Sequence, residues 1–194
     1  MRINKFLSEA GAKICVVHPD CNRSIEENAD FYLRLLPIAK DLGVRIAAEN
    51  LYLWDDEKNQ AKKAACSNHN DYKELIMAVG DDFFVACLDI GHAEMKGLET
   101  SAIQMIGTLK KHIKALHIHD NDLWRDCHQL PYTMNIDFSS ILKSLYQAGY
   151  DGYFTFETKR YITDGDDVAE KMKTMAKTAR KMAREFELYS RFSF

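Results

Sequence analysis

The sequence predicts an α/β fold of the (β/α)8-barrel type that contains five strand–helix units. Two observations lead to this class. Five short apolar runs alternate with segments of helical periodicity, which is typical of a parallel sheet with right-handed crossovers. The runs are also nearly continuous in their apolar character, as expected of strands covered on both faces. A doubly wound sheet would satisfy the same pattern, but the barrel directly explains why each run ends in a residue that can bind a metal.

The strands are expected at 14–18, 44–49, 83–89, 114–119 and 153–157. Helical periodicity over 26–42 ends at Gly43, and further helices are predicted at 70–79, 100–111, 137–148 and 166–188. Residues 2–10 look like the end of a helix that Gly11 terminates. Two long loops, 50–68 and 120–136, complete the expected order of elements.

Length and composition are those of one ordinary globular domain spanning residues 1–194. The net charge of −3, with 26 basic and 29 acidic residues, argues against a nucleic-acid partner, because such proteins carry a basic surface. We find no signal peptide and no apolar run of ~18 residues, so a membrane partner is not expected. Five cysteines without CxxC spacing predict reduced thiols in a cytoplasmic protein.

The carboxyl ends of the five strands carry the residues with metal-binding chemistry. Side chains at these ends converge in an α/β fold, although they lie tens of residues apart in sequence. The strand ends offer two glutamates, one aspartate and two or three histidines. Carboxylates brought close together repel one another unless a cation lies between them. A divalent-metal site is therefore the favoured interpretation, and structural hydrogen bonding at strand ends is the alternative.

Six short motifs occur in order along the chain: HP at His18, EN at Glu49, DIGH at 89–92, HIHDND at 117–122, DCHQLP at 126–131 and FE at Glu157. Their order resembles that of the xylose isomerase-like TIM barrels, a superfamily that includes sugar-phosphate isomerases, epimerases and the endonuclease IV type of AP endonuclease (AP endonuclease family 2). The resemblance covers essentially the whole chain and matches the last five of the eight βα units. It implies an incomplete barrel that lacks the first three strands.

The resemblance also implies a ligand set for one divalent ion, which would be Mn²⁺, Mg²⁺, Co²⁺ or Zn²⁺. By motif, the ligands are Glu49, Asp89, His119 and Glu157. Three carboxylates and an imidazole suit these ions, and no thiolate is offered to select a softer one. In the epimerases of the superfamily, two glutamates also move the proton on and off carbon, which makes Glu49 and Glu157 the candidate catalytic residues.

Two histidines compete for the single imidazole position. His117 and His119 are two residues apart, so both point to the same side of their strand. The one nearer the carboxyl end should reach the ion, which favours His119. His117 is then expected to lie in the core or to contact the metal ligands without binding the ion itself.

Further residues have roles that the resemblance suggests. His92 and Arg125 match substrate-binding positions of epimerases, although a solvent-exposed loop arginine is an equally good interpretation of Arg125. His18, Asp126 and His128 are candidates for additional metal ligands, because the D-x-H pair resembles ligands of the multi-zinc nuclease type.

The favoured function is a metal-dependent sugar or sugar-phosphate isomerase or epimerase, in which glutamate-mediated proton transfer proceeds through a metal-stabilised enediolate. The partner would be a small-molecule sugar or sugar phosphate, and a homo-oligomer is left open. One alternative is a multi-zinc phosphodiesterase of the endonuclease IV type. The other is an inactive barrel fragment, or one that needs another chain, because five strands leave two open sheet edges.

Overall fold

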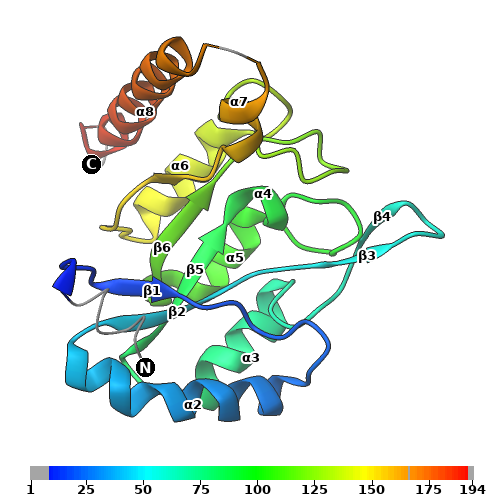
Figure 1. The fold of residues 1–194 in the computed structure, drawn as a ribbon, viewed down its shortest axis with the longest axis vertical. Coiled ribbons are helices and arrows are strands. Elements are labelled where there is room, and N and C mark those ends of the chain that lie inside the picture. The colour runs from blue at the N-terminus through cyan, green and yellow to red at the C-terminus, as the bar shows by residue number, and fades with distance from the viewer. Residues whose placement is uncertain (1–8, 166, 192–194) are drawn as a thin grey trace.

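The computed structural model describes residues 9–165 and 167–191, and its centre is a five-stranded parallel sheet in the order β1-β2-β5-β6-β7. Of the helix predicted over 2–10, all but the last two residues lie outside this part of the chain. The strands, all pairing in parallel, are β1 (Ile14–Val16), β2 (Arg45–Glu49), β5 (Phe84–Asp89), β6 (Ile113–Ile118) and β7 (Thr155–Phe156). The sheet is curled into a half-barrel, which confirms the predicted fold class (Figure 1).

Helices pack one against the next along one side of the sheet, in the order α2, α3, α5, α6 and α8 (Figure 1). Their bounds are α2 (Ile25–Leu42), α3 (His69–Val79), α5 (Ala102–Leu109), α6 (Phe138–Gln147) and α8 (Val168–Arg191). Local sequence explains several helix ends. Ser24 and Glu27 form a capping box at the start of α2, and Gly43 ends that helix with a left-handed φ of 63°. Asp137 accepts a hydrogen bond from the Ser140 amide and caps α6, as the sequence predicts.

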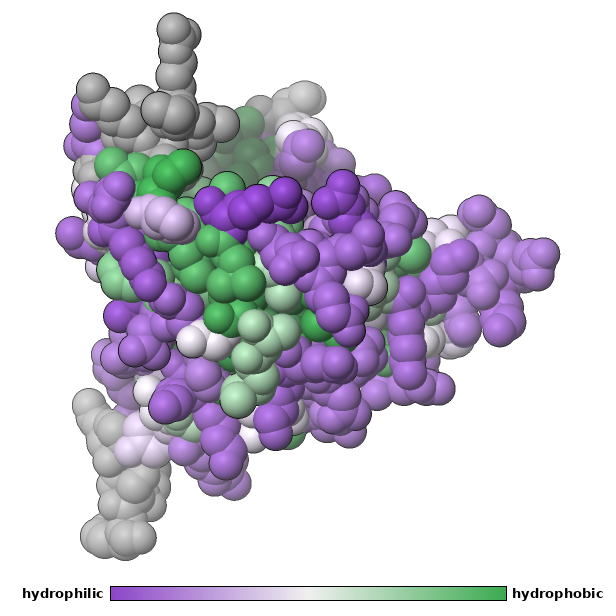
Figure 2. Space-filling view, turned by 90° about the horizontal axis from the view of Figure 1, so that it is seen from below, coloured by the Kyte–Doolittle hydropathy of each residue, from purple (hydrophilic) through white to green (hydrophobic). Residues whose placement is uncertain are grey.

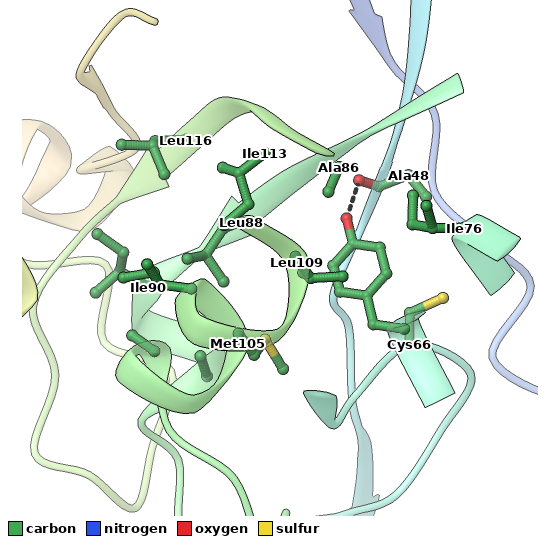
Figure 3. Close-up of a cluster of buried hydrophobic side chains, with 14 of the residues drawn as sticks. Ala48, Cys66, Ile76, Ala86, Leu88, Ile90, Met105, Leu109, Ile113 and Leu116 are labelled. Atoms are coloured by element: carbon green, nitrogen blue, oxygen red, sulfur yellow. Dashed lines mark hydrogen bonds between the residues drawn. The ribbon is translucent and has the colours of Figure 1, made fainter. Parts of the chain in front are cut away.

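The main core lies between the helices and the sheet. Tyr72 of α3 is fully buried there, and its hydroxyl donates to the carbonyls of Ala48 in β2 (2.5 Å) and Cys87 in β5 (3.1 Å). Figure 3 shows the bond to Ala48 among the apolar side chains of β5, α5 and β6. One buried phenol thus ties together the two strands that end in Glu49 and Asp89.

A smaller apolar cluster lies on the other face of the sheet, the concave side of the half-barrel. Ala47, Val85 and Cys87 form its buried centre, and half-buried Ile14, Val16 and Ala115 pack against it. All five cysteines are free. Burial raises the pKa of the Cys87 thiol to about 11, so this side chain stays neutral and belongs to the apolar cluster.

The structure adds elements that periodicity did not predict. The loop at 50–68 contains an antiparallel hairpin, β3 (Leu53–Asp55) and β4 (Gln60–Lys62), which packs through Ala61 against Met95 and Leu98. Short helices, α4 (Ile90–Ala93) and α7 (Lys159–Thr163), follow β5 and β7, and a 3-10 turn (Lys110–His112) precedes β6. They are too short for a periodic pattern to reveal.

The surface seen in Figure 2 is mostly hydrophilic, with an apolar patch near its centre. None of the helices in the described part of the chain combines the length and the apolar character needed to cross a bilayer.

Candidate metal centre

Successive side chains of a strand point to opposite faces of the sheet, and this alternation brings the candidate ligands to the concave face. Glu49 lies two residues beyond Ala47, and Asp89 two residues beyond Cys87, so both carboxylates extend the rows of side chains that form the concave apolar cluster. Glu157 directly follows β7. The carboxyl ends of three strands therefore deliver three carboxylates to one end of the half-barrel.

These carboxylates and one histidine form what we call the carboxylate group: Glu49, Asp89, His117 and Glu157. One ligand atom from each lies within 4.8 Å of the ligand atoms of the others. Nδ1 of His117 is 3.0 Å from Glu49 Oε2 and 2.9 Å from Glu157 Oε2. The set spans strands β2, β5 and β6 and the end of β7.

The donor atoms of this group fit a divalent cation. Glu49 Oε2, Asp89 Oδ2, His117 Nδ1 and Glu157 Oε2 are buried, yet none of them has a hydrogen-bond partner of acceptable geometry. Buried polar atoms are nearly always hydrogen-bonded, so four that converge without bonding one another indicate a missing common partner. Three carboxylate oxygens and an imidazole nitrogen are ligands of the kind that Mn²⁺, Mg²⁺, Co²⁺ and Zn²⁺ accept.

His117, and not His119, lies in the carboxylate group, which differs from the expectation based on strand-end position. The reason is strand register. His117 is the direct partner of Asp89 across the β5–β6 ladder, after a register shift between Ala86 and Cys87. His119 lies one full pleat repeat further along, about 6.6 Å by strand geometry. It contacts Asp89 from that side, with Nε2 3.2 Å from Oδ1.

A second constellation, which we call the histidine group, adjoins the first: His92, His119, Asp126 and His128. The Nε2 atoms of His92, His119 and His128 lie 3.5, 3.6 and 3.0 Å from carboxylate oxygens of Asp126. The rings of His119 and His128 stack with centroids 4.1 Å apart. Both ring nitrogens of fully buried His119 and Oδ1 of Asp126 lack hydrogen-bond partners. Three imidazoles and a carboxylate are a ligand set suited to zinc.

The loop that carries Asp126 and His128 is held by the buried carboxylate of Asp120. Its oxygens accept hydrogen bonds from the backbone amides of Thr133, Met134 and Ile136 at 2.8–3.1 Å. His128 is fixed in addition by a 2.7 Å contact between its Nδ1 and the Glu157 carbonyl. The loop therefore holds its two candidate ligands in fixed positions.

Asn50 connects the two central ligand strands. Its side chain donates to the Asp89 carbonyl (2.9 Å) and accepts from the Asp89 amide (2.8 Å), and its carbonyl lies 3.0 Å from His92 Nδ1. The EN motif drew attention to Glu49, while the supporting role of Asn50 depends on a neighbouring strand that sequence alone does not place beside it.

Electrostatics couple the two groups. Burial works to raise the pKa of Asp89, but the charges of His92 and His119 outweigh it and lower that pKa to about 2. Burial works to lower the pKa of His92, but Asp89 and Asp126 raise it to about 10. His117, whose Nδ1 lies 2.9 Å from Oε2 of Glu157, holds the pKa of Glu157 below its usual value. The raised pKa values of His92, His117 and His128 thus favour their protonated forms, whose positive charges compensate the carboxylates.

A groove of about 290 Å³ opens over both groups. Its walls include Glu49, His92, Asp126, His128 and Glu157, together with Cys21, Leu51 and Tyr52. His18 also lies on the groove, with Nε2 3.3 Å from Glu49 Oε2. Tyr52 was not singled out from the sequence; its hydroxyl donates to Asp126 Oδ2 (3.4 Å), and its ring meets His92 edge-on.

Arg125 is a predicted site residue that the structure brings neither to the two groups of candidate ligands nor to the walls of the groove. Its guanidinium donates to Asp122 Oδ2 at 2.7 and 2.9 Å, and its side chain is 76% exposed. Asp122 Oδ1 also accepts from the Arg125 amide, so a local turn directs the arginine into solvent.

Comparison with solved structures gives the same architecture. L-ribulose 3-epimerase superposes on 98% of this chain with a TM-score of 0.75 at 18% identity, and the chain covers 66% of that protein. The IOLI protein with a bound zinc atom superposes on 95% of this chain and 68% of its own, with a TM-score of 0.73 at 18% identity. D-allulose 3-epimerase from Methylomonas sp. gives a TM-score of 0.73 at 15% identity, over 95% of this chain and 67% of its own.

Sequence comparison identifies the family. An uncharacterised protein of Methanocaldococcus jannaschii is 24% identical over 160 residues, which are 78% of this chain and 52% of that protein. The chain thus spans about half the length of this curated relative. The family model described as xylose isomerase-like TIM barrel matches residues 3–182. The chain belongs to the xylose isomerase-like TIM-barrel family.

Proposed function

We propose that this protein is a metal-dependent sugar or sugar-phosphate isomerase or epimerase. The observation that carries the proposal is the carboxylate group, in which three carboxylates and His117 direct unbonded polar atoms toward one point. Structural neighbours with the same fold are named as sugar 3-epimerases, which supports a sugar as the substrate. A groove of about 290 Å³ is close to the size of small-ligand sites.

Glu49, Asp89, His117 and Glu157 would hold the divalent ion. When bound, the ion supplies an electrophile that makes the carbon acid beside a substrate carbonyl easier to deprotonate. Nδ1 of His117 lies within 3.0 Å of an oxygen of each glutamate, so the three side chains are close enough together to share one ion.

Glu49 and Glu157 would exchange the proton with substrate carbon through an enediolate. Both line the groove, and they come from β2 and from the end of β7, so they approach a bound sugar from different strands. The lowered pKa of Glu157 keeps this carboxylate ionised at neutral pH, the form required of a base. If Glu157 removes the proton on one side of the carbon and Glu49 returns one on the other, the product is the epimer.

Isotope exchange tests the proposal across many candidate sugars at once. The protein is loaded with Mn²⁺ or Co²⁺ and incubated in D₂O with a panel of ketoses and ketose phosphates. Proton transfer at carbon introduces deuterium next to the carbonyl, which mass spectrometry detects. A panel in which no sugar takes up deuterium above a metal-free control would contradict the proposal.

The histidine group supports a second candidate, a phosphodiesterase that uses more than one ion. Three imidazoles and Asp126 beside the carboxylate group would allow two ions to be held side by side, an arrangement that suits hydrolysis of phosphate esters. Elemental analysis separates the two functions, together with hydrolysis of bis-p-nitrophenyl phosphate. About one ion per chain and no hydrolysis favour the isomerase, whereas two or more ions with hydrolysis favour the phosphodiesterase.

A further inference from the structure

Strand register places the thiol of Cys87 beside two residues of the carboxylate group. Cys87 is the direct partner of Glu49 across the ladder between β2 and β5. It precedes Asp89 by two residues on β5, so its side chain points to the same concave face. The sequence predicted an ordinary reduced thiol at this position, because the register between strands cannot be read from spacing along the chain.

Glu49, Cys87 and His117 form what we call the thiol cluster. One ligand atom from each lies within 4.8 Å of the ligand atoms of the other two. A divalent ion such as Zn²⁺ holds sulfur at about 2.3 Å and nitrogen or oxygen at about 2.0–2.2 Å, so two ligand atoms of one ion lie up to about 4.5 Å apart. Small side-chain rotations are therefore enough to bring all three ligands onto one ion.

Unbonded polar atoms and an apolar floor meet at this cluster. Glu49 Oε2 and His117 Nδ1 are buried without a hydrogen-bond partner of acceptable geometry, and the Glu49 side chain is only 2% exposed. Cys87 is fully buried and belongs to the concave apolar cluster, together with Ala47 and Val85. An ion at the thiol cluster would thus lie deeper than one held by carboxylates alone, in surroundings that exclude water.

The core holds the backbones of two of these ligands in place. The hydroxyl of Tyr72 donates to the carbonyl of Cys87 (3.1 Å) and to that of Ala48 (2.5 Å), the residue before Glu49. The ladder between β2 and β5 then keeps Glu49 and Cys87 side by side. The two ligands are therefore already close together before an ion binds.

Ligand chemistry distinguishes the thiol cluster from the carboxylate group. The two sets share Glu49 and His117, but one adds the oxygens of Asp89 and Glu157 and the other adds the sulfur of Cys87. Carboxylates suit Mg²⁺ and Mn²⁺, whereas a thiolate selects softer ions such as Zn²⁺. Because two ligands are common to both sets, only one of the two positions can have its full set of ligands at a time.

We propose that Glu49, Cys87 and His117 form a second position for a divalent ion, which takes thiophilic ions such as Zn²⁺ and Cd²⁺. Binding forms a bond between the ion and the Cys87 sulfur and releases the thiol proton to solvent. A thiophilic ion at this position withdraws Glu49 and His117 from the carboxylate group and thereby displaces Mn²⁺. The inference concerns ion binding alone and does not depend on the reaction proposed above.

Cadmium tests the proposal, because a cadmium–thiolate bond absorbs in the ultraviolet where bonds from cadmium to carboxylate or imidazole do not. The three half-buried cysteines, Cys15, Cys21 and Cys127, are first replaced by serine, which leaves the two fully buried ones, Cys66 and Cys87. This parent protein is freed of metal, loaded with Mn²⁺ and titrated with Cd²⁺. The thiolate band should appear, and electron paramagnetic resonance should show release of Mn²⁺ as it grows.

Two further substitutions in this parent should separate the two positions. Cys87→Ser should abolish the thiolate band and leave Mn²⁺ binding nearly unchanged. Glu157→Gln removes a ligand of the carboxylate group only, so it should keep the band and weaken Mn²⁺ binding at least tenfold. Cys66→Ser is the matched control for loss of a fully buried thiol and should keep both the band and Mn²⁺ binding. Circular dichroism checks that each variant folds.

X-ray absorption at the cadmium edge adds a measurement on the parent that needs no change at Cys87. One sulfur ligand beside nitrogen and oxygen is expected, and a shell of nitrogen and oxygen alone would overturn the proposal. A thiolate band that persists in folded Cys87→Ser would also overturn it. So would a band that grows to completion while Mn²⁺ stays bound, because the two positions would then share no ligands.

Discussion

Asp89 and His117 are direct partners across the ladder between β5 and β6, and this pairing determines which histidine joins the carboxylate group. The two side chains come from neighbouring strands, and the pairing places them at the same level on the concave face, within the carboxylate group. His119 falls into the adjacent histidine group instead. The two histidines should therefore have separable effects on metal binding.

Substituting His117 with Ala should weaken binding of the ion at the carboxylate group by at least tenfold, since one of four ligands is lost. His119→Ala should instead weaken a second binding event and leave the first nearly unchanged. Isothermal titration of the chelator-treated protein with Zn²⁺ or Co²⁺ resolves the two. If His119→Ala removed the first event and His117→Ala spared it, the assignment of His117 to the primary site would be wrong.

Glu157→Gln should lower the rate of deuterium exchange by a factor of at least 10², because a neutral amide cannot accept a proton from carbon. Glu99→Gln is the matched control, since Glu99 is exposed and forms an ion pair with Lys63 on the surface. The exchange assay in D₂O, run at equal metal loading, measures both variants. Full activity in Glu157→Gln would remove this residue from the mechanism.

Gly91 is a position at which a single methyl group should disturb one group of ligands and spare the other. A Cβ at this position would lie 2.0 Å from Cε1 of His119, whose side chain is fully buried. Gly91→Ala should therefore displace the His119 ring and reduce the second metal-binding event. The same titration should show the first event largely retained, and Gly107→Ala, in open space on α5, serves as the control.

Tyr72→Phe tests the link between the core and the site. The substitution leaves the buried carbonyls of Ala48 and Cys87 without the phenolic donor, which should cost about 1–3 kcal/mol of unfolding free energy. Urea denaturation followed by circular dichroism measures this loss. Stability equal to that of the wild type would show that these hydrogen bonds contribute little.

Stability of the metal-free protein should fall at alkaline pH, and His92 should account for part of the fall. Its pKa is raised from 6.5 to about 10 in the folded state, chiefly by Asp89 and Asp126 acting against burial. The stabilisation is complete below pH 6.5 and disappears as the pH rises through about 10. Thermal unfolding of chelator-treated protein between pH 7 and 10 should show a steeper decline for the wild type than for His92→Gln. Parallel declines would contradict a charged His92.

The sheet and its main helices could be predicted because each has a strong local signal. Nearly continuous apolar runs identified β2, β5 and β6, and the Gly43 signal placed the end of α2 within one residue. The hairpin at Leu53–Lys62 was missed because its strands have three residues each and few apolar side chains. Its packing on Met95 and Leu98 is a tertiary contact that local pattern does not encode.

The candidate site could be predicted as a set of residues but not as a geometry. Glu49, Asp89 and Glu157 come together as strand-end convergence requires, since that convergence is a property of the whole fold. The choice between His117 and His119 depends on register, and the irregularity between Ala86 and Cys87 has no sequence signal that we could recognise. Arg125 pairs with Asp122 through a local turn that competes with any role at the groove.

The two-way hydrogen bond between Asn50 and the backbone of Asp89 has a consequence for how fast the site can capture an ion. Because the backbones carrying Glu49 and Asp89 are already joined, an arriving cation has only side-chain torsions to order. Association should then be limited by shedding of water from the ion and not by rearrangement of the chain. An Asn50→Ala variant should therefore bind an ion more slowly, because the backbones that carry Glu49 and Asp89 would no longer be held together before the ion arrives.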